Sequence, residues 1–447
     1  METTITDKFI RFFKLFFPLL FTQAALIGTS VCSTIFSGLA GTDDLAGVAI
    51  GSNLWIPLYT GMLGIFLGIT PILSQLLGAE KKENIGTIIL QSIYLAIAFG
   101  IVIILLGSIC VQPLLAYMNL APKVEYVALH YLKAIAWGVI PIFIFTTLRN
   151  VIDSHSKAPI SMAILVINFF ITLALFNVFI FGEMGAPALG GIGTGYAISV
   201  ASWITCAIFL LVLWFKKPFS HYNIFRNLTL PSWHYWYEQL RIGFPIGAAI
   251  FCEVSIFSIV TLLMSQYGTA IIAAHQAATS FATFIYIVPL SVGLCATILV
   301  GFEVGAQRYR AARQYAFICS GFSLFAALLI GVYCFTHAYD IARVFTKDDD
   351  IATTIISFIA YAVFFIITDA IGTPAQGILR GYKDVKSISF IAVVSYWVVS
   401  LPVGFLLAQY TDMKPYGYWL GLIIGLLVAG ITYNIRLVMI QRNYPKQ

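Results

Sequence analysis

Two acidic residues lie inside long apolar runs of the sequence. Glu253 stands in "GAAIFCEVSIFSIVTLL" (247–263), and Asp369 stands in "YAVFFIITDAIGTPAQGILRGYKD" (361–384). A charge in hydrocarbon is costly, so an acidic residue in such a run is a candidate for a functional site. Two carboxylates in a low-dielectric pocket are expected to take up protons in a coupled way or to share a small cation. This pattern therefore predicts reversible binding of a coupling cation, Na⁺ or a proton, at Glu253 and Asp369.

Aromatic and neutral polar residues accompany the two acids. Phe257 follows Glu253 by four residues and Phe365 precedes Asp369 by four, so each ring shares a helical face with its carboxylate. Aromatic faces attract cations, and packing in the core explains the rings equally well. Further candidate contacts to the cation or a substrate are Gln276, Ser280, Tyr286, Ser33, Asn53, Asn168 and Asn177.

Structural interpretations of these residues remain open. The two acids can be hydrogen-bonded packing groups, paired with residues such as Gln276, Ser280 or Ser395. The asparagines can be interhelical hydrogen-bonding residues. Beyond Asp369, Gly372 and Pro374 predict a kink that frees carbonyl groups or provides a hinge.

A second set of charges repeats at the expected cytoplasmic ends of two apolar runs. Arg149 and Asp153 occur in "LRNVID", and Arg380 and Asp384 occur in "LRGYKD". These residues can form ion pairs that close the cytoplasmic side, or they can be topogenic charges with solvated partners.

Other patterns do not favour an enzyme or a metalloprotein. The seven cysteines include no CxxC pair, and His275 has no second ligand at a useful spacing, which favours a packing or gating role. The run "GGIGTG" (190–195) lacks the spacing of a nucleotide-binding loop and is expected to allow close helix packing. We expect no catalytic residues, no cofactor beyond the coupling ion, and no metal beyond Na⁺ at Glu253 and Asp369.

The elements that position these residues are membrane spans. The chain of 447 residues is 60% hydrophobic and only 10% charged, with a mean hydropathy of +0.93, which is typical of a polytopic membrane protein. A span needs about 20 apolar residues. Such runs predict twelve helices near 14–37, 48–76, 88–110, 127–149, 159–181, 190–215, 239–265, 275–301, 315–336, 352–377, 387–408 and 417–437.

The distribution of basic residues predicts the orientation. Most Lys and Arg residues fall at the two termini and in the loops after the even-numbered spans. Because cytoplasmic segments carry the excess of positive charge, both termini are expected in the cytoplasm, with the chain spanning the cell membrane several times.

The two halves of the sequence resemble each other. At a constant spacing of 227 residues, identical residues occur in five pairs: Pro18 and Pro245, Gly41 and Gly268, Ala46 and Ala273, Gly78 and Gly305, and Ala79 and Ala306. We therefore expect an all-α membrane protein of two six-helix bundles, related by a pseudo-two-fold axis along the membrane normal, an arrangement common in transporters. The expected divisions are a lobe at 1–218, a linker at 219–238 and a lobe at 239–447.

Several blocks, in order, resemble one known family. The chain contains "STIFSGLAGTDDLAGVAIGSNLW", "PILSQLLGA", "LRNVIDSHSKAP", "GAPALGGIGTGYA", "GFPIGAAIFCEVSIFSIVTLL", "AAHQAATSF", "LRGYKDV" and "SYWVVSLPVGFLL". In these it resembles the multidrug and toxic compound extrusion (MATE) transporters, in particular the NorM branch, over nearly its whole length. The resemblance implies export of organic cations and other amphiphilic toxins, driven by Na⁺ or H⁺ entry as two bundles rock between inward-open and outward-open states.

The resemblance also assigns roles and shows two departures. It implies that Glu253 and Asp369 bind the coupling cation. The position of Phe365 is a tyrosine in much of the NorM branch, so a hydroxyl oxygen is missing here. In the first span the family usually reads "VDT" where this chain reads "CST", so Ser33 replaces an acid. We therefore expect coupling to depend on the pair in the second half.

Two other function classes serve as alternatives. A lipid-linked precursor flippase of related architecture would need a basic cavity, whereas the intramembrane charges here are acidic. A channel or receptor would show flux without exchange, or no flux. The expected partners are lipophilic cationic substrates and membrane lipids, with no nucleic acid, and the protein is expected to work as a monomer.

Overall fold

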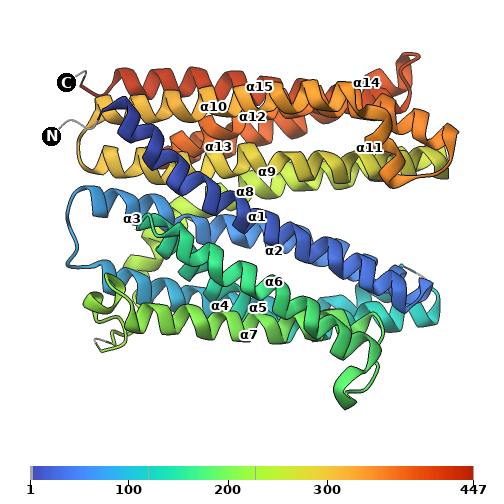
Figure 1. Cartoon of the computed structure of the whole chain (residues 1–447), viewed down its shortest axis with the longest axis horizontal. Coiled ribbons are helices and arrows are strands. Elements are labelled where there is room, and N and C mark those ends of the chain that lie inside the picture. Colours follow the sequence, from blue (N-terminus) through green and yellow to red (C-terminus); the bar gives the residue numbers. More distant parts are fainter. Residues whose placement is uncertain (1–3, 119, 227, 446–447) are drawn as a thin grey trace. The chain divides into compact units, whose positions relative to one another are not determined.

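The computed structural model describes residues 4–118, 120–226 and 228–445, and within these ranges the chain is almost entirely helical (Figure 1). The helices of the first half are α1 (Ile5–Ala40), α2 (Thr42–Leu67), α3 (Ile69–Gly78), α4 (Ile85–Tyr117), α5 (Pro122–Ser154), α6 (Ala158–Phe181) and α7 (Ile192–Phe215). Those of the second half are α8 (Trp233–Met264), α9 (Thr269–Gly305), α10 (Tyr309–Thr336), α11 (Ala338–Phe345), α12 (Asp349–Gly381), α13 (Val385–Val393), α14 (Leu401–Tyr410) and α15 (Pro415–Arg442).

Short helical turns complete the fold. Three are 3₁₀ turns: η1 (Glu183–Gly185), η2 (Phe219–Tyr222) and η3 (Ser265–Tyr267). A π-helical segment, η4 (Val394–Ser400), joins α13 to α14 without a break. Such segments are rare and occur often at functional sites.

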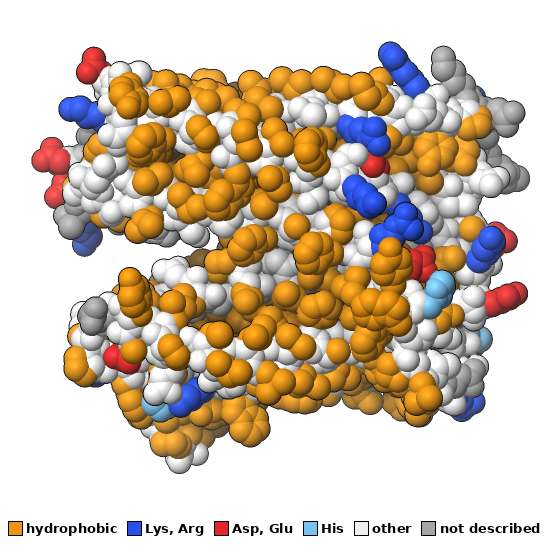
Figure 2. Space-filling view, turned by 180° about the vertical axis from the view of Figure 1, so that it is seen from behind, with side chains coloured by type: hydrophobic (Ala, Val, Ile, Leu, Met, Phe, Trp, Pro, Cys, Tyr) orange, Lys and Arg blue, Asp and Glu red, His pale blue; other side chains and the backbone are white. Residues whose placement is uncertain are grey.

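The helices have the length and composition of membrane spans. Among the described residues, twelve helical segments are long and apolar enough to cross a membrane, which matches the twelve expected from the sequence. Figure 2 shows apolar side chains over most of the visible face, with charged side chains gathered toward the helix ends. Because lipid-facing helix surfaces must be apolar, this is the surface expected of a multi-pass membrane protein.

The chain divides into two compact units that are not continuous in sequence. The first unit contains Met1–Leu20, Ser74–Glu80 and Pro245–Gln447, and the second contains Phe21–Leu73 and Lys81–Phe244. The segments 1–20 and 74–80 therefore group with the C-terminal helices. The principal boundary, between Phe244 and Pro245, lies inside α8 rather than in the connection 219–238.

Close backbone packing of α9 against α12 organises the first unit. A Cβ atom on Gly377 would lie 2.1 Å from the Gly293 carbonyl oxygen, so these helices meet backbone to backbone. The Thr297 hydroxyl, on α9, donates a 3.0 Å hydrogen bond to the Gly377 carbonyl oxygen. Small residues allow this approach, as is common between helices in membranes.

Glycines have the same role in the second unit. A Cβ atom on Gly193 would lie 2.4 Å from the Phe179 carbonyl oxygen, and one on Gly195 would lie 2.9 Å from that of Tyr131. The Asp44 carboxylate accepts a 2.6 Å hydrogen bond from the backbone N–H of Gly191 at the start of α7. The run "GGIGTG" thus packs α7 closely against α5 and α6, as expected.

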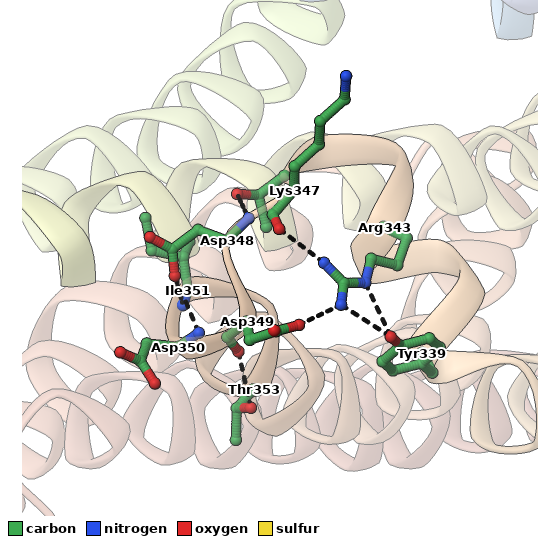
Figure 3. A network of polar contacts seen from close by, with 9 residues as sticks. Tyr339, Arg343, Lys347, Asp348, Asp349, Asp350, Ile351 and Thr353 are labelled. Atoms are coloured by element: carbon green, nitrogen blue, oxygen red, sulfur yellow. Dashed lines mark hydrogen bonds and ion pairs between the residues drawn. The ribbon is translucent and has the colours of Figure 1, made fainter.

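A polar network fixes the entry to α12 (Figure 3). The Arg343 guanidinium donates to the Tyr339 hydroxyl at 2.8 Å and to the Lys347 carbonyl oxygen at 2.8 Å, and it pairs with Asp349. The Asp348 carboxylate caps the helix by accepting from the backbone N–H groups of Asp350 and Ile351. These contacts join α11 to the start of α12, the helix that carries Asp369.

The connection between the halves is held by α4 and by the end of α5. Gln91 donates to the Leu230 carbonyl oxygen at 2.8 Å and accepts from the backbone N–H of Ser232 at 2.9 Å. His155 lies between the Val151 carbonyl oxygen, 2.7 Å from its Nδ1, and the Tyr222 hydroxyl, 3.0 Å from its Nε2. These two distances fit a neutral imidazole that donates from Nδ1 and accepts at Nε2.

We expect His155 to make the protein less stable in mild acid. Burial lowers the pKa of His155 to about 4, and the nearby Lys82 charge acts in the same direction. The unfolded chain binds the proton at about pH 6.5, so stability is complete above that pH and is lost as the pH falls toward 4. Thermal unfolding at pH 7.5 and 5 should show a smaller acid-induced loss for His155→Asn than for the wild type; equal losses would contradict this assignment.

Candidate cation-binding site

The two acids expected to bind a cation lie in the same compact unit. Asp369 is in the middle of α12 and is 3% exposed, whereas Glu253, on the part of α8 that belongs to the same unit, is half-buried. The two carboxylates interact electrostatically. The fold therefore brings together two acids that are separated by more than a hundred residues.

Tyr286 and Thr373 connect the acids. The Tyr286 hydroxyl lies 3.4 Å from Oε1 of Glu253 and also interacts with the Thr373 side chain. The Thr373 hydroxyl donates a 2.8 Å hydrogen bond to Oδ1 of Asp369. Tyr286 was a candidate contact from the sequence, and its position on α9 places it beside both carboxylates.

The second oxygen of Asp369 is a buried acceptor. Within the described part of the chain, Oδ2 has no hydrogen-bond partner. A buried carboxylate oxygen without a donor is energetically unfavourable unless it binds a cation or carries a proton. Both possibilities are forms of cation binding.

A third buried carboxylate provides a contrast. Glu303, at the end of α9, is 3% exposed. Its two oxygens lie 3.7 Å from Nη1 of Arg11 and 2.7 Å from Nε of Arg308. In the described chain Oε2 of Glu303 also lacks a hydrogen bond, but two arginine side chains neutralise this carboxylate, as expected for a structural ion pair.

A buried cation lies on the other side of Glu253. Arg380 is 5% exposed, and its Nη2 donates a 2.9 Å hydrogen bond to Oε1 of Gln376. Gln376 also hydrogen-bonds to Glu253, and Arg380 interacts electrostatically with the same carboxylate. A continuous polar chain therefore runs from Asp369 through Thr373, Tyr286, Glu253 and Gln376 to Arg380.

The two phenylalanines pack against each other beside the acids. The ring centroids of Phe257 and Phe365 are 5.6 Å apart in an edge-to-face arrangement. The ring centroids of Phe365 and Trp419 are 6.4 Å apart. Phe365 is 5% exposed, so core packing accounts for its position. Their contribution to cation binding stays a prediction.

Other candidate contacts lie elsewhere. Gln276 and Ser280 are exposed on α9, where the Ser280 hydroxyl donates to the Gln276 carbonyl oxygen rather than to an acid. In the second unit, Asn168 accepts a 2.7 Å hydrogen bond from the Thr205 hydroxyl, an interhelical bond between α6 and α7. Ser33 is buried in α1, Asn53 is exposed on α2, and Asn177 is half-buried on α6.

The arginine and the aspartate of each repeated "LR…D" block do not form a salt bridge with each other in the described structure. Asp384 is bound by Nε of Arg436, on α15, at 2.7 Å, which leaves Arg380 to the buried polar chain. Asp153 accepts a hydrogen bond from the Ser161 hydroxyl and interacts with Arg149 only electrostatically. The reason is that each arginine has another partner: Nη2 of Arg380 binds Gln376, and Nη1 of Arg149 lies 3.5 Å from Oε1 of Gln23.

His275, for which a packing or gating role was expected, is buried and has a hydrogen-bond partner at each ring nitrogen. Its Nδ1 accepts from the Trp419 indole N–H at 3.1 Å, and its Nε2 lies 2.9 Å from the Thr261 hydroxyl. Among the described residues, no group of three or more His, Cys, Asp or Glu could hold a metal ion.

Sequence reasoning missed several members of the site. Thr373 and Gln376 follow Asp369 at helical spacings of four and seven residues, so a signal for them was present. Arg380, eleven residues after Asp369, was expected in a cytoplasmic ion pair and not beside the acids. Tyr396 and Tyr433 also interact electrostatically with Glu253, from η4 and α15. No sequence signal pointed to these two, because only the fold brings their helices to the acids.

Comparisons with known proteins identify the family. The MatE family model matches twice, at residues 18–179 and 245–406, so both ends of the two matches are offset by the same 227 residues found in the sequence. The chain is 44% identical over 440 residues to "Probable multidrug resistance protein NorM" of Oceanobacillus iheyensis, covering 98% of both chains. It is 45% identical over 444 residues to the protein of that name from Bacillus anthracis, covering 99% of this chain and 98% of that one.

The chain belongs to the MATE family. Among solved structures, it resembles "Outward-facing conformation of a multidrug resistance MATE family transporter of the MOP superfamily", with a TM-score of 0.89 at 17% identity over 98% of this chain and 96% of that one. It also resembles the transporter in "Crystal structure of eukaryotic MATE transporter AtDTX14", with a TM-score of 0.88 at 18% identity, over 97% of this chain and 96% of that one. These likenesses establish the MATE fold, and the expected all-α fold with a repeated six-helix half is confirmed.

Proposed function

We propose that this MATE protein is a multidrug efflux transporter that exports lipophilic organic cations in exchange for inward-moving Na⁺ or protons. Support for efflux comes from the family and from relatives named as probable multidrug resistance proteins. No observation favours an enzymatic activity. The proposed substrates are lipophilic cations and other amphiphilic drugs.

The observation that carries the coupling mechanism is the partnerless oxygen of Asp369 beside a second carboxylate, in the part of the chain that the structure describes. A cation bound there would be shared by Asp369 and Glu253, with the Tyr286 hydroxyl as a further oxygen. Coupling then requires that ion and drug favour opposite-facing states, because a ligand bound equally to both states shifts nothing.

Pro374 leaves a backbone carbonyl near Asp369 without its helical hydrogen bond. Proline lacks the N–H that would bind the Ala370 carbonyl oxygen one turn earlier. The neighbouring Ile371 carbonyl oxygen accepts from Asn434 of α15 at 3.2 Å. The Ala370 carbonyl oxygen, which lacks this helical donor, would suit Na⁺ coordination, whereas the carboxylates alone would suit a proton.

We propose further that the protein works as a monomer in a bacterial cytoplasmic membrane, surrounded by lipid, with both termini in the cytoplasm. The excess of Lys and Arg in the even-numbered loops supports this orientation.

Export from proteoliposomes tests the function. Vesicles loaded with a fluorescent organic cation would be given a Na⁺ gradient, a pH gradient or neither. We expect one gradient to accelerate dye movement over protein-free vesicles. If neither gradient changes the rate of dye movement, the result would contradict the proposal and would reopen the flippase and channel alternatives.

A further inference from the structure

The buried Arg380 has no role in the scheme above, yet it lies in the same polar chain as the acids. Its Nη2 binds Gln376, and, within the described residues, its buried Nε has no hydrogen-bond partner. A buried guanidinium that is incompletely hydrogen-bonded is costly unless a nearby negative charge stabilises it. Glu253 is the carboxylate with which Arg380 interacts.

The surroundings of Arg380 contain one acid and three tyrosines. Glu253 comes from α8, Tyr286 from α9, Tyr396 from η4 and Tyr433 from α15. Asp384, which immediately precedes α13, is bound by Arg436 instead. Together with Asp369, which interacts with Glu253, the described charged groups of the polar chain are two carboxylates and one guanidinium. Their net charge is one negative unit when both acids are ionised.

The repeat provides an independent comparison. Tyr59 matches Tyr286 at the spacing of 227, and Arg149 matches Arg380 at the spacing of 231. Arg149 likewise interacts with Tyr59 and has a buried Nε without a hydrogen-bond partner in the described chain. Leu26 and Gly138 stand at the positions that correspond to Glu253 and Asp369. Both halves thus contain the buried arginine and tyrosine, but only the second half combines them with two acids.

We propose that Arg380 is the internal counter-ion of the Glu253–Asp369 pair and limits the site to one monovalent cation, Na⁺ or a proton. This inference rests on the proposed cation coupling. With Arg380 present, one cation makes the site neutral. Without it, the site carries two negative units, binds the first ion more tightly and releases it more slowly.

The expected size of the effect follows from electrostatics. At an effective dielectric constant of about 20, unit charges within roughly 10 Å change each other's ion affinity by roughly tenfold or more. We therefore expect Arg380→Gln to lower the half-maximal concentration of the driving ion by about tenfold or more, while the maximal rate of dye export falls. Arg380→Lys keeps the charge and should change the half-maximal concentration by less than about threefold.

The test compares ion affinity among the full-length wild type, Arg380→Gln, Arg380→Lys and Arg149→Gln. The readouts are the half-maximal ion concentration for dye export and that for thermal stabilisation of the purified protein, which does not depend on transport. Arg149→Gln is the matched control, because it removes the corresponding buried arginine from the half without the acid pair; its ion affinity should equal that of the wild type.

A double variant gives the sharpest result. Glu253→Gln alone leaves one carboxylate, Asp369, and the Arg380 guanidinium, so the site has no net charge. This variant should therefore lose ion-dependent stabilisation. Adding Arg380→Gln restores one net negative charge, and ion-dependent stabilisation should return to within about threefold of the wild type. Because this variant leaves one buried carboxylate where Arg380→Gln leaves two, it also keeps the inference testable if Arg380→Gln alone does not fold.

The outcomes separate this inference from the proposed function. A wild type that responds to neither ion would mean that the proposed function has failed. If Asp369→Asn removes the ion response but Arg380→Gln shifts ion affinity no more than Arg149→Gln does, only this inference is overturned. Failure of the double variant to recover ion-dependent stabilisation would also overturn it.

Discussion

Asp369→Asn is expected to reduce ion-driven dye export by roughly ten- to hundredfold. The substitution keeps the size of the side chain and its bond to Thr373. It removes the charge at Oδ2, which has no hydrogen-bond partner among the described residues. Interactions with a charged group contribute about 1.5–3 kcal/mol, or roughly one to two factors of ten in affinity. Glu253→Gln should have an effect of the same order, because both carboxylates share the cation.

The control for Asp369→Asn is Ser33→Ala. Ser33 stands at the position where the family usually has an acid, and it is buried in α1 as a neutral group. We expect Ser33→Ala to change ion-driven export by at most about twofold, since no charge is lost. Export rates of the three variants would be measured in proteoliposomes at equal protein content. Equal losses from Ser33→Ala and Asp369→Asn would contradict the assignment of coupling to the second half.

Gly377→Ala is expected to have a comparably large effect through packing. The new Cβ atom would lie 2.1 Å from the Gly293 carbonyl oxygen, and a backbone atom cannot rotate away. Overpacking of this kind typically costs about 1–3 kcal/mol, and α12 would have to move off α9. This movement would separate Thr373 and Asp369 from Tyr286, so both stability and transport should fall.

Gly321→Ala serves as the matched control for Gly377→Ala. Gly321 is exposed on α10 of the same unit, and a Cβ atom there would meet nothing within 4 Å. Because alanine favours helix over glycine by about 0.5–1 kcal/mol, this variant should be as stable as the wild type or slightly more stable. The midpoint of thermal unfolding in detergent would be compared for both. If Gly377→Ala unfolds at the same temperature as Gly321→Ala, the packing account of the site is incorrect.

The sequence was sufficient to predict the membrane spans, the repeat and the two buried acids. Twelve apolar runs predicted the twelve membrane-length helices, and the 227-residue spacing predicted a repeat that the family matches reproduce. Glu253 and Asp369 were identifiable because a carboxylate in an apolar run is a strong exception to the local composition.

The remaining parts depend on tertiary structure. The partner of Asp384 is Arg436, which is far from it in sequence, so the local spacing to Arg380 pointed to a different pairing. Tyr396 reaches the acids from a π-helical segment, and the sequence does not indicate that change of helical phase. The grouping of residues 1–20 with the second half likewise follows from packing rather than from composition.

Simultaneous recording of ion entry and dye export in the same proteoliposomes tests the central claim most directly. Na⁺ or proton movement would be followed with an indicator on the receiving side while the fluorescent organic cation moves outward, for the wild type and for Asp369→Asn. The account predicts that, in the wild type, dye export and ion entry rise and fall together, and that Asp369→Asn loses both. Dye export without ion entry in the wild type, or coupled exchange that survives Asp369→Asn, would contradict the claim that the buried acids couple the two movements.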